Sequence, residues 1–381
     1  MAACIALAAS TLAGCQRAPE PVRFIAEGKP ATLSEWHVVE SDGRRLRLNT
    51  GVLPYDLNTP LFSDYAHKLR TVWMPAGQAA QYQERDAFDF PVGTVITKTF
   101  YYPRVDGAPA GSPLVRQTYA SDEAASPADG LDLARVRLIE TRVLVRRADG
   151  WAALPYVWNA EQTEATLERT GDQKALELVD DAGRHQAFTY VVPNENQCAS
   201  CHVVDLKSKA FTPIGPKARH LNRDLRYADG TDNQLARWAR AGYLGGLPGH
   251  AHWGELPRAA DWRDEQAPLA ERARAYLDIN CAHCHQARAT ASNTALRLDA
   301  FAPQDWNMGL CKPTVAAGKG TGDRVFAVVP GQPDASIMTF RLGSTEGGVM
   351  MPELGRSTVH EEGLRLVRQW IGSLAGRCDP A

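Results

Sequence analysis

The sequence predicts a multidomain α+β protein, with an all-β sandwich or barrel-like first part followed by a mostly α-helical second part. In the first part, residues 94–102 are dense in β-branched and aromatic side chains, which is typical of a strand. Residues 137–147 and 151–158 are predicted to form a hairpin, because an Asp-Gly turn separates them. In the second part, residues 267–285 and 359–375 carry apolar side chains at helical spacing.

Further elements of the first part follow from local composition. The strand at 137–147 alternates β-branched residues with a set that includes Glu140 and Arg142. Residues 107–130 are rich in Ala, Ser, Pro, Asp and Gly, so we expect a long surface loop. Residues 54–68 are aromatic and polar without a period, and we expect an ordered connection there, with a binding loop or a docking edge as alternatives.

Each predicted helix has an apolar stripe that indicates packing against a neighbour. Charged residues fall between the apolar ones, as on a solvated face, and Glu361 and Glu362 suit the first turn of the second helix because the helix dipole favours anions there. The stripes contain Leu269, Ala273, Tyr276 and Leu277 in the first helix and Leu364, Val367, Trp370, Ile371 and Leu374 in the second.

The overall composition excludes several classes of protein. The 381 residues suggest two or three domains. The formal charge, 42 − 44 = −2, is too balanced for a polybasic nucleic-acid surface, so we expect no nucleic-acid partner. With 44% hydrophobic and 23% charged residues, the chain is not predominantly disordered. The sequence has no apolar run of about 18 residues, which excludes a polytopic membrane protein.

The N-terminal segment indicates export. Residues 12–15, Leu-Ala-Gly-Cys, follow a small apolar stretch and resemble a bacterial lipobox. The resemblance implies a signal peptide at 1–14, a diacylglycerol on Cys15, and a tether over 15–31. Each buried CH₂ of a lipid chain contributes about 0.8 kcal/mol, so more than one chain gives a stable anchor. By the same resemblance Gln16 suggests the outer membrane of a Gram-negative bacterium.

Two C-x-x-C-H motifs, at 198–202 and 281–285, carry the chemistry. Two thiols three positions apart lie on one side of a helical turn, where both add to the vinyl groups of one porphyrin. The His that follows then reaches the iron as a proximal ligand. The sequence therefore predicts two covalently bound haem c groups, held by Cys198, Cys201 and His202 and by Cys281, Cys284 and His285.

Two other interpretations of these cysteines are weaker. A zinc ribbon places its C-x-x-C pairs about 15–20 residues apart, whereas these pairs are 281 − 198 = 83 residues apart. A thioredoxin-like C-x-x-C requires no following His. His283, between two cysteines, is expected to be an exposed helical residue rather than a ligand.

A distal ligand for the second iron is predicted from the segment at 347–352. This Gly-bounded segment places Met351 directly before a proline, 66 residues after His285, and resembles the distal loop of class I cytochromes c. The resemblance implies that Met351 binds the iron and that Met350 packs nearby.

The candidates for the distal ligand of the first iron are different. No Met occurs between it and the second motif, which leaves His220, His250, His252, a lysine or water. His220 is the first candidate, and a surface His in a basic loop is the alternative. Two further cysteines, Cys311 and Cys378, belong to no local motif and are expected to form a disulfide in an oxidising compartment.

Seven segments, in order, resemble those of an uncharacterised family of bacterial dihaem c-type cytochromes. The resemblance covers residues 32–375 and implies haem c and export, without a substrate. We expect a β-rich domain at 32–195, an irregular first haem module at 196–265, and a class I cytochrome c-like second module at 266–376. The segments are PYDLNTPLFSDYAHKLR, FDFPVGT, LIETRVLVRRADGW, VPNENQCASCH, IGPKARHLN, YLDINCAHCH and VMMPELGR.

The function that these observations favour is electron transfer rather than catalysis. The expected protein faces the periplasm, is lipid-anchored to the outer or inner membrane, and has redox partners such as a dehydrogenase, the quinol pool or a soluble cytochrome. One alternative is a dihaem peroxidase-like enzyme with an open first haem. Another is a binding lipoprotein whose β domain recognises a ligand and whose haems are accessory.

Overall fold

The structure is a computed structural model with an α+β composition, 28% strand and 20% helix, as the sequence predicts. The predicted signal peptide and Cys15 lie outside the residues that the structure describes, and so does His250. The described residues are 20–109, 111–119, 130–249, 252–315 and 318–379.

A six-stranded antiparallel sheet forms the centre of the molecule, with strand order β11-β10-β9-β6-β4-β3. The sheet is open, with β11 and β3 at its edges. The predicted hairpin is confirmed as β9 and β10, with Gly150 at φ 138° directly opposite Arg147. The bounds are β3 Leu53–Tyr55, β4 His67–Trp73, β6 Val95–Pro103, β9 Val136–Arg147, β10 Gly150–Trp158 and β11 Ala165–Leu167.

Smaller sheets flank the six-stranded sheet. One has the order β1-β2-β8, and another has the order β13-β12-β7 with β7 parallel to β12. Two-stranded pairs join β14 to β15 and β16 to β5. The bounds are β1 Val39–Ser41, β2 Arg45–Leu48, β5 Ala80–Gln81, β7 Leu114–Arg116, β8 Leu131–Asp132, β12 Asp172–Val179, β13 His185–Val192, β14 Asp224–Tyr227, β15 Gly230–Asn233 and β16 Leu244–Gly245.

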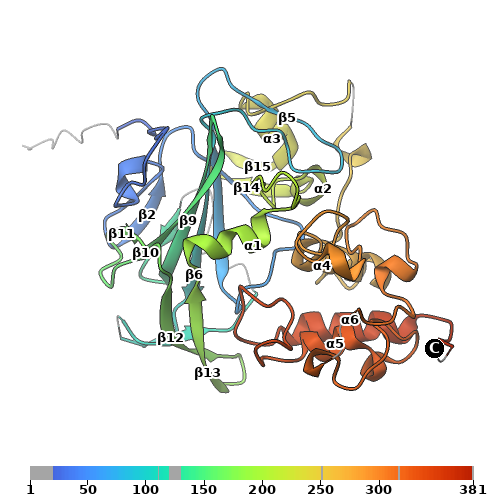
Figure 1. Ribbon diagram of the computed structural model, residues 1–381. Helices are drawn as coiled ribbons and strands as arrows, with labels where there is room; N and C mark the ends of the chain where they lie inside the picture. Colours follow the sequence, from blue (N-terminus) through green and yellow to red (C-terminus); the bar gives the residue numbers. More distant parts are fainter. Residues whose placement is uncertain (1–19, 110, 120–129, 250–251, 316–317, 380–381) are drawn as a thin grey trace, which may run out of the picture.

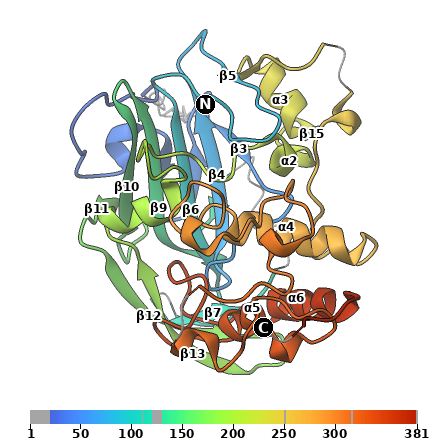
Figure 2. The ribbon, with the colours of Figure 1, turned by 45° about the vertical axis from the view of Figure 1, so that its right-hand side comes forward.

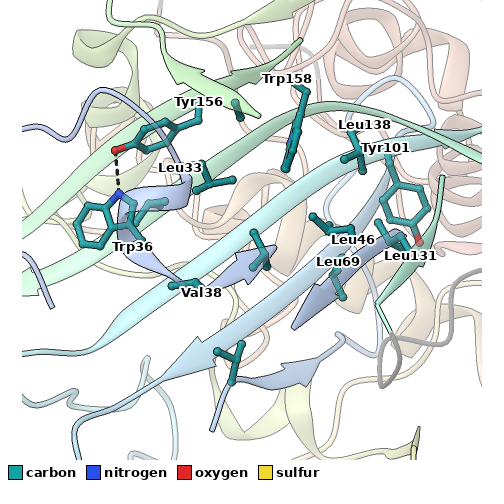
Figure 3. Close-up of a cluster of buried hydrophobic side chains, with 14 of the residues drawn as sticks. Leu33, Trp36, Val38, Leu46, Leu69, Tyr101, Leu131, Leu138, Tyr156 and Trp158 are labelled. Carbon is teal, nitrogen blue, oxygen red and sulfur yellow. Dashed lines mark hydrogen bonds between the residues drawn. The ribbon is translucent and has the colours of Figure 1, made fainter. Parts of the chain in front are cut away.

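One hydrophobic core packs the N-terminal strands against a face of the six-stranded sheet (Figure 3). Leu33, Leu46 and Leu131 are fully buried there, and each such side chain stabilises the fold by about 1.5–3 kcal/mol. Trp36 Nε1 donates a 2.8 Å hydrogen bond to Tyr156 Oη, so the one polar atom of the indole is satisfied inside the core.

The helices gather on one side of the six-stranded sheet (Figures 1 and 2). Both predicted long helices are confirmed, as α4 and α6, and they pack on each other. Gly363 of α6 lies against the ring of Tyr276 of α4 so closely that a Cβ at 363 would stand 2.5 Å from ring carbons. The bounds are α1 Cys198–His202, α2 Ala218–Leu221, α3 Gln234–Arg240, α4 Leu269–Cys281, α5 Ile337–Leu342 and α6 Glu361–Ser373.

The segment between β3 and β4 docks the sheet onto the helical part. The backbone N–H of Phe62 donates to Asn280 Oδ1 at 2.8 Å. The buried carboxylate of Asp64 accepts from the backbone N–H and the hydroxyl of Thr358, both at 2.8 Å. The residues at 54–68 thus act as a docking edge, one of the alternatives that the sequence left open.

A disulfide joins Cys378, which follows α6, to Cys311, as the sequence predicts. Across the part of the chain that the structure describes, no helix is long and apolar enough to cross a membrane.

Candidate functional site: two C-x-x-C-H motifs in contact

The first motif forms the short helix α1, and a capping box precedes it. Asn194 Oδ1 accepts a 2.9 Å hydrogen bond from the backbone N–H of Gln197, and the Gln197 side chain accepts one of 2.9 Å from the backbone N–H of Asn194. Two backbone donors are thereby satisfied at the start of the helical turns. The extended segment predicted before the motif therefore turns into a helix where the first cysteine begins.

His202 is oriented as a metal-binding imidazole is. Its Nδ1 lies 2.9 Å from the carbonyl oxygen of Thr212, and the Thr212 N–H donates back to the His202 carbonyl at 2.8 Å. Within the described residues Nε2 has no hydrogen-bond partner. Burial, together with the nearby charge of Lys98, lowers the pKa of His202 to about 3, so the ring is neutral. An imidazole that is held through Nδ1 and carries no proton on Nε2 can bind iron through Nε2.

The second motif begins at the last residue of α4, and its His is held in a similar way. His285 Nδ1 lies 3.2 Å from Thr294 Oγ1. The Thr294 hydroxyl donates its own proton to the Ala291 carbonyl at 2.7 Å, so its oxygen is available as an acceptor for the imidazole N–H. His285 is buried, and burial lowers its pKa as well.

The two motifs are in direct contact although 83 residues separate them. Cys284 Sγ lies 3.4 Å from the carbonyl oxygen of Ser200, and Thr290 Oγ1 lies 3.3 Å from the same oxygen. The thiols of Cys201 and Cys284 share a hydrogen bond, which raises the pKa of Cys201 and lowers the pKa of Cys284 to about 4. The thiols that would carry two porphyrins therefore lie side by side.

A cavity lies between α1, the six-stranded sheet and α4. Its volume is about 140 Å³. Of the predicted site residues, the whole first motif lines it, whereas the second motif contributes only His283. Lining side chains used below are Arg70, Lys98, Arg142, Cys198, Cys201, His202, His283, Pro352 and Arg356.

His283 is not the exposed residue that the sequence suggested. It is 7% exposed, lines the cavity, and its Nδ1 is buried without a hydrogen-bond partner within the described residues. The periodicity of α4 is local and does not reveal what covers each face. His283 follows α4 directly, and it lines the same cavity as His202.

His220, the first candidate for distal ligand of the first haem, is 1% exposed and is no surface residue. Its Nε2 lies 3.2 Å from Asp278 Oδ2, and the Arg219 guanidinium binds the same carboxylate at 2.7 and 2.9 Å. His220 does not line the cavity, and His252 is exposed. Of His220 and His283, only His283 lines the cavity, and each has a buried Nδ1 without a hydrogen-bond partner among the described residues.

Met351 lies in the loop between α5 and α6. Its backbone N–H donates to the Arg341 carbonyl at 3.0 Å, and its carbonyl accepts from Arg356 Nη2 at 2.9 Å. The peptide bond to Pro352 is cis. Pro352 and Arg356 line the cavity, but Met350 and Met351 do not.

Comparison with known proteins adds no relative. No family model, no curated protein and no solved structure matches this chain. Among the described residues, no group of three or more His, Cys, Asp or Glu side chains is arranged to hold a metal ion. A haem c site needs no such group, because the porphyrin supplies four ligands and each motif supplies one His.

Proposed function

We propose that this chain is an exported dihaem c-type cytochrome of the bacterial family that it resembles, and that it transfers electrons between a periplasmic or membrane donor and an acceptor. The observation that carries the proposal is the contact between the two motifs, where Cys284 Sγ lies 3.4 Å from the carbonyl oxygen of Ser200, because adjacent attachment sites give electrons a short path. The lipid anchor at Cys15 is part of the same proposal.

The residues present fit haem c. Each motif offers two thiols and an imidazole, half-buried in His202 and buried in His285, whose Nδ1 is held by Thr212 or Thr294, which leaves Nε2 for iron. His202 and His285 would be the proximal ligands, and Met351 the distal ligand of the second haem. Bound haem supplies a one-electron redox centre, and the protein tunes its potential through axial ligands, hydrogen bonds and burial.

The chain's own residues would position and protect these groups. The hydrogen bonds of Phe62 and Asp64 with Asn280 and Thr358 hold the β-rich part against the predicted second haem module, and the sheet lines the cavity on one side. We propose the domain limits 32–195, 196–265 and 266–376 for this arrangement, with the β-rich domain positioning the first haem as well as any docking partner.

A pyridine haemochrome spectrum tests the proposal. The protein is produced with a haem c maturation system, purified, and assayed for haem per polypeptide. We expect two haems in the wild type and one in each of the double variants C198S/C201S and C281S/C284S. A colourless wild-type protein, or one with zinc in place of haem iron, would contradict the assignment.

A further inference from the structure

A row of cations crosses the sheet on the face that lines the cavity. Arg70 of β4 is directly opposite Lys98 of β6, and Lys98 is directly opposite Arg142 of β9. All three line the cavity that the first motif also lines. Like charges directly opposite each other in a sheet are destabilising, so this arrangement calls for a compensating anion.

The protein neutralises only part of this row. Arg70 Nη1 pairs with Asp56 Oδ1 at 2.7 Å, and Arg142 Nη2 pairs with Glu140 Oε1 at 2.6 Å. Lys98 has no carboxylate within 4.0 Å among the described residues, and its Nζ lies over the ring of Phe100, 5.1 Å from the centroid.

A further lysine lies beside this row. Lys68 lies two residues before Arg70 on β4, so it faces the same side of the sheet as Arg70. Its Nζ donates to the carbonyl of Leu61 at 2.9 Å. Asp56 is also shared with Arg223, at 3.3 Å. Burial and the neighbouring cations lower the pKa of Lys98 to about 7 and the pKa of Lys68 well below its usual value, so an added anion is needed to keep these ammonium groups charged.

The row lies close to the first motif. Lys98 is near enough to Cys201 and His202 to act on them electrostatically, and Arg142 acts on Cys198 and Cys201. The row and the motif line the same cavity, so a group that is attached to the two thiols and fills this cavity meets the cations.

We propose that Arg70, Lys98 and Arg142 bind the propionate carboxylates of the haem attached at Cys198 and Cys201, which rests on the proposed function. A haem carries two propionates, and both are anions when ionised. Charge-assisted hydrogen bonds to Arg and Lys are the strong kind, and Arg presents a planar fork that matches a carboxylate. Two added negative charges would complete the pairing that the sheet lacks, with Lys98 as the central partner.

The test is the reduction potential of each haem in Lys98→Gln, with Lys98→Arg as the conservative variant. A cation beside a haem favours the reduced state, so its removal lowers the potential of that haem. At a fixed applied potential we expect about a tenfold lower ratio of reduced to oxidised first haem in K98Q, equivalent to about 59 mV for a one-electron couple. K98R should restore the wild-type ratio, and the second haem should not change.

The matched control is Lys207→Gln, an exposed lysine five residues after His202. It removes one charge near the same motif without touching the row, so it should leave both potentials as in the wild type. Two haems per chain with an unchanged first potential in K98Q would overturn the inference alone. Fewer than two haems in the wild type would overturn the proposed function.

A second measurement covers the case in which K98Q does not retain the first haem. The wild type is made with ¹³C-labelled propionates, and an infrared difference spectrum is recorded on reduction of the first haem. Labelled bands of ionised carboxylates that shift with reduction support the pairing with the cation row. Labelled bands of protonated carboxyl groups overturn it, because a neutral propionate does not compensate a cation.

Discussion

Two glycines of α6 give opposite predictions for one substitution. A Cβ at Gly363 would lie 2.5 Å from ring carbons of Tyr276, whereas a Cβ at Gly372 meets nothing within 4 Å. Overpacking of this kind costs about 1–3 kcal/mol, and replacing a helical glycine by alanine gains about 0.5–1 kcal/mol. Gly363→Ala should therefore lower the free energy of unfolding by about 1–2 kcal/mol, and Gly372→Ala should leave it unchanged or raise it by up to about 1 kcal/mol.

Urea unfolding of the haem-loaded protein, followed by far-ultraviolet circular dichroism, measures both variants. With a slope of about 3 kcal/mol per molar urea, the Gly363→Ala midpoint should fall by about 0.5 M. Equal midpoints for the two alanine variants would refute the close packing of α4 on α6. The comparison is internal to one helix, so it removes the effect of helix propensity from the difference.

The remaining predictions concern ligands and one buried ion pair. Met351→Ala should abolish the weak far-red thioether–iron absorption band, and Met350→Ala should keep it; the reverse result would exchange their roles. His283→Gln should turn the first haem high-spin by electron paramagnetic resonance, while His220→Gln should not; a low-spin first haem in H283Q would exclude that ligand. Asp278→Asn leaves the guanidinium paired with it buried and unpaired, so the free energy of unfolding should fall by about 3–5 kcal/mol. Burial raises the pKa of the Asp278 carboxyl, but its basic partners outweigh this and lower it overall, so wild-type stability should decline as the pH falls below about 4. Urea titrations from pH 3 to 7 should show a smaller decline for D278N.

Sequence periodicity predicted the elements whose signal is local. The β9–β10 hairpin and helices α4 and α6 all lie within segments where side-chain alternation or helical spacing is strong. The docking role of Phe62 and Asp64 was only one of several alternatives, because their partners lie 218 and 294 residues away and leave no local pattern. Long-range pairing of this kind depends on the whole topology.

Only the local part of the candidate site could be predicted, because long-range contacts leave no local pattern. The two C-x-x-C-H motifs are contiguous, so the spacing alone identified their cysteines and histidines. The burial of His283 and the alignment of Lys98 with Arg142 arise only when three separate strands and α4 meet. The alternation around Glu140 is typical of a strand with one solvated face, yet Glu140 is buried, pairs with Arg142 and accepts a hydrogen bond from Tyr190 of β13.

The shared hydrogen bond between Cys201 and Cys284 has a consequence for the order of biogenesis. In the oxidising compartment that we propose, a chain that finishes folding early would hold the free cysteines of the two motifs close together. Oxidation would then form a non-native disulfide between the two motifs and block the attachment of both haems. Haem attachment must therefore be faster than the completion of folding. A reductant that keeps these thiols reduced would set the yield of haem-loaded protein.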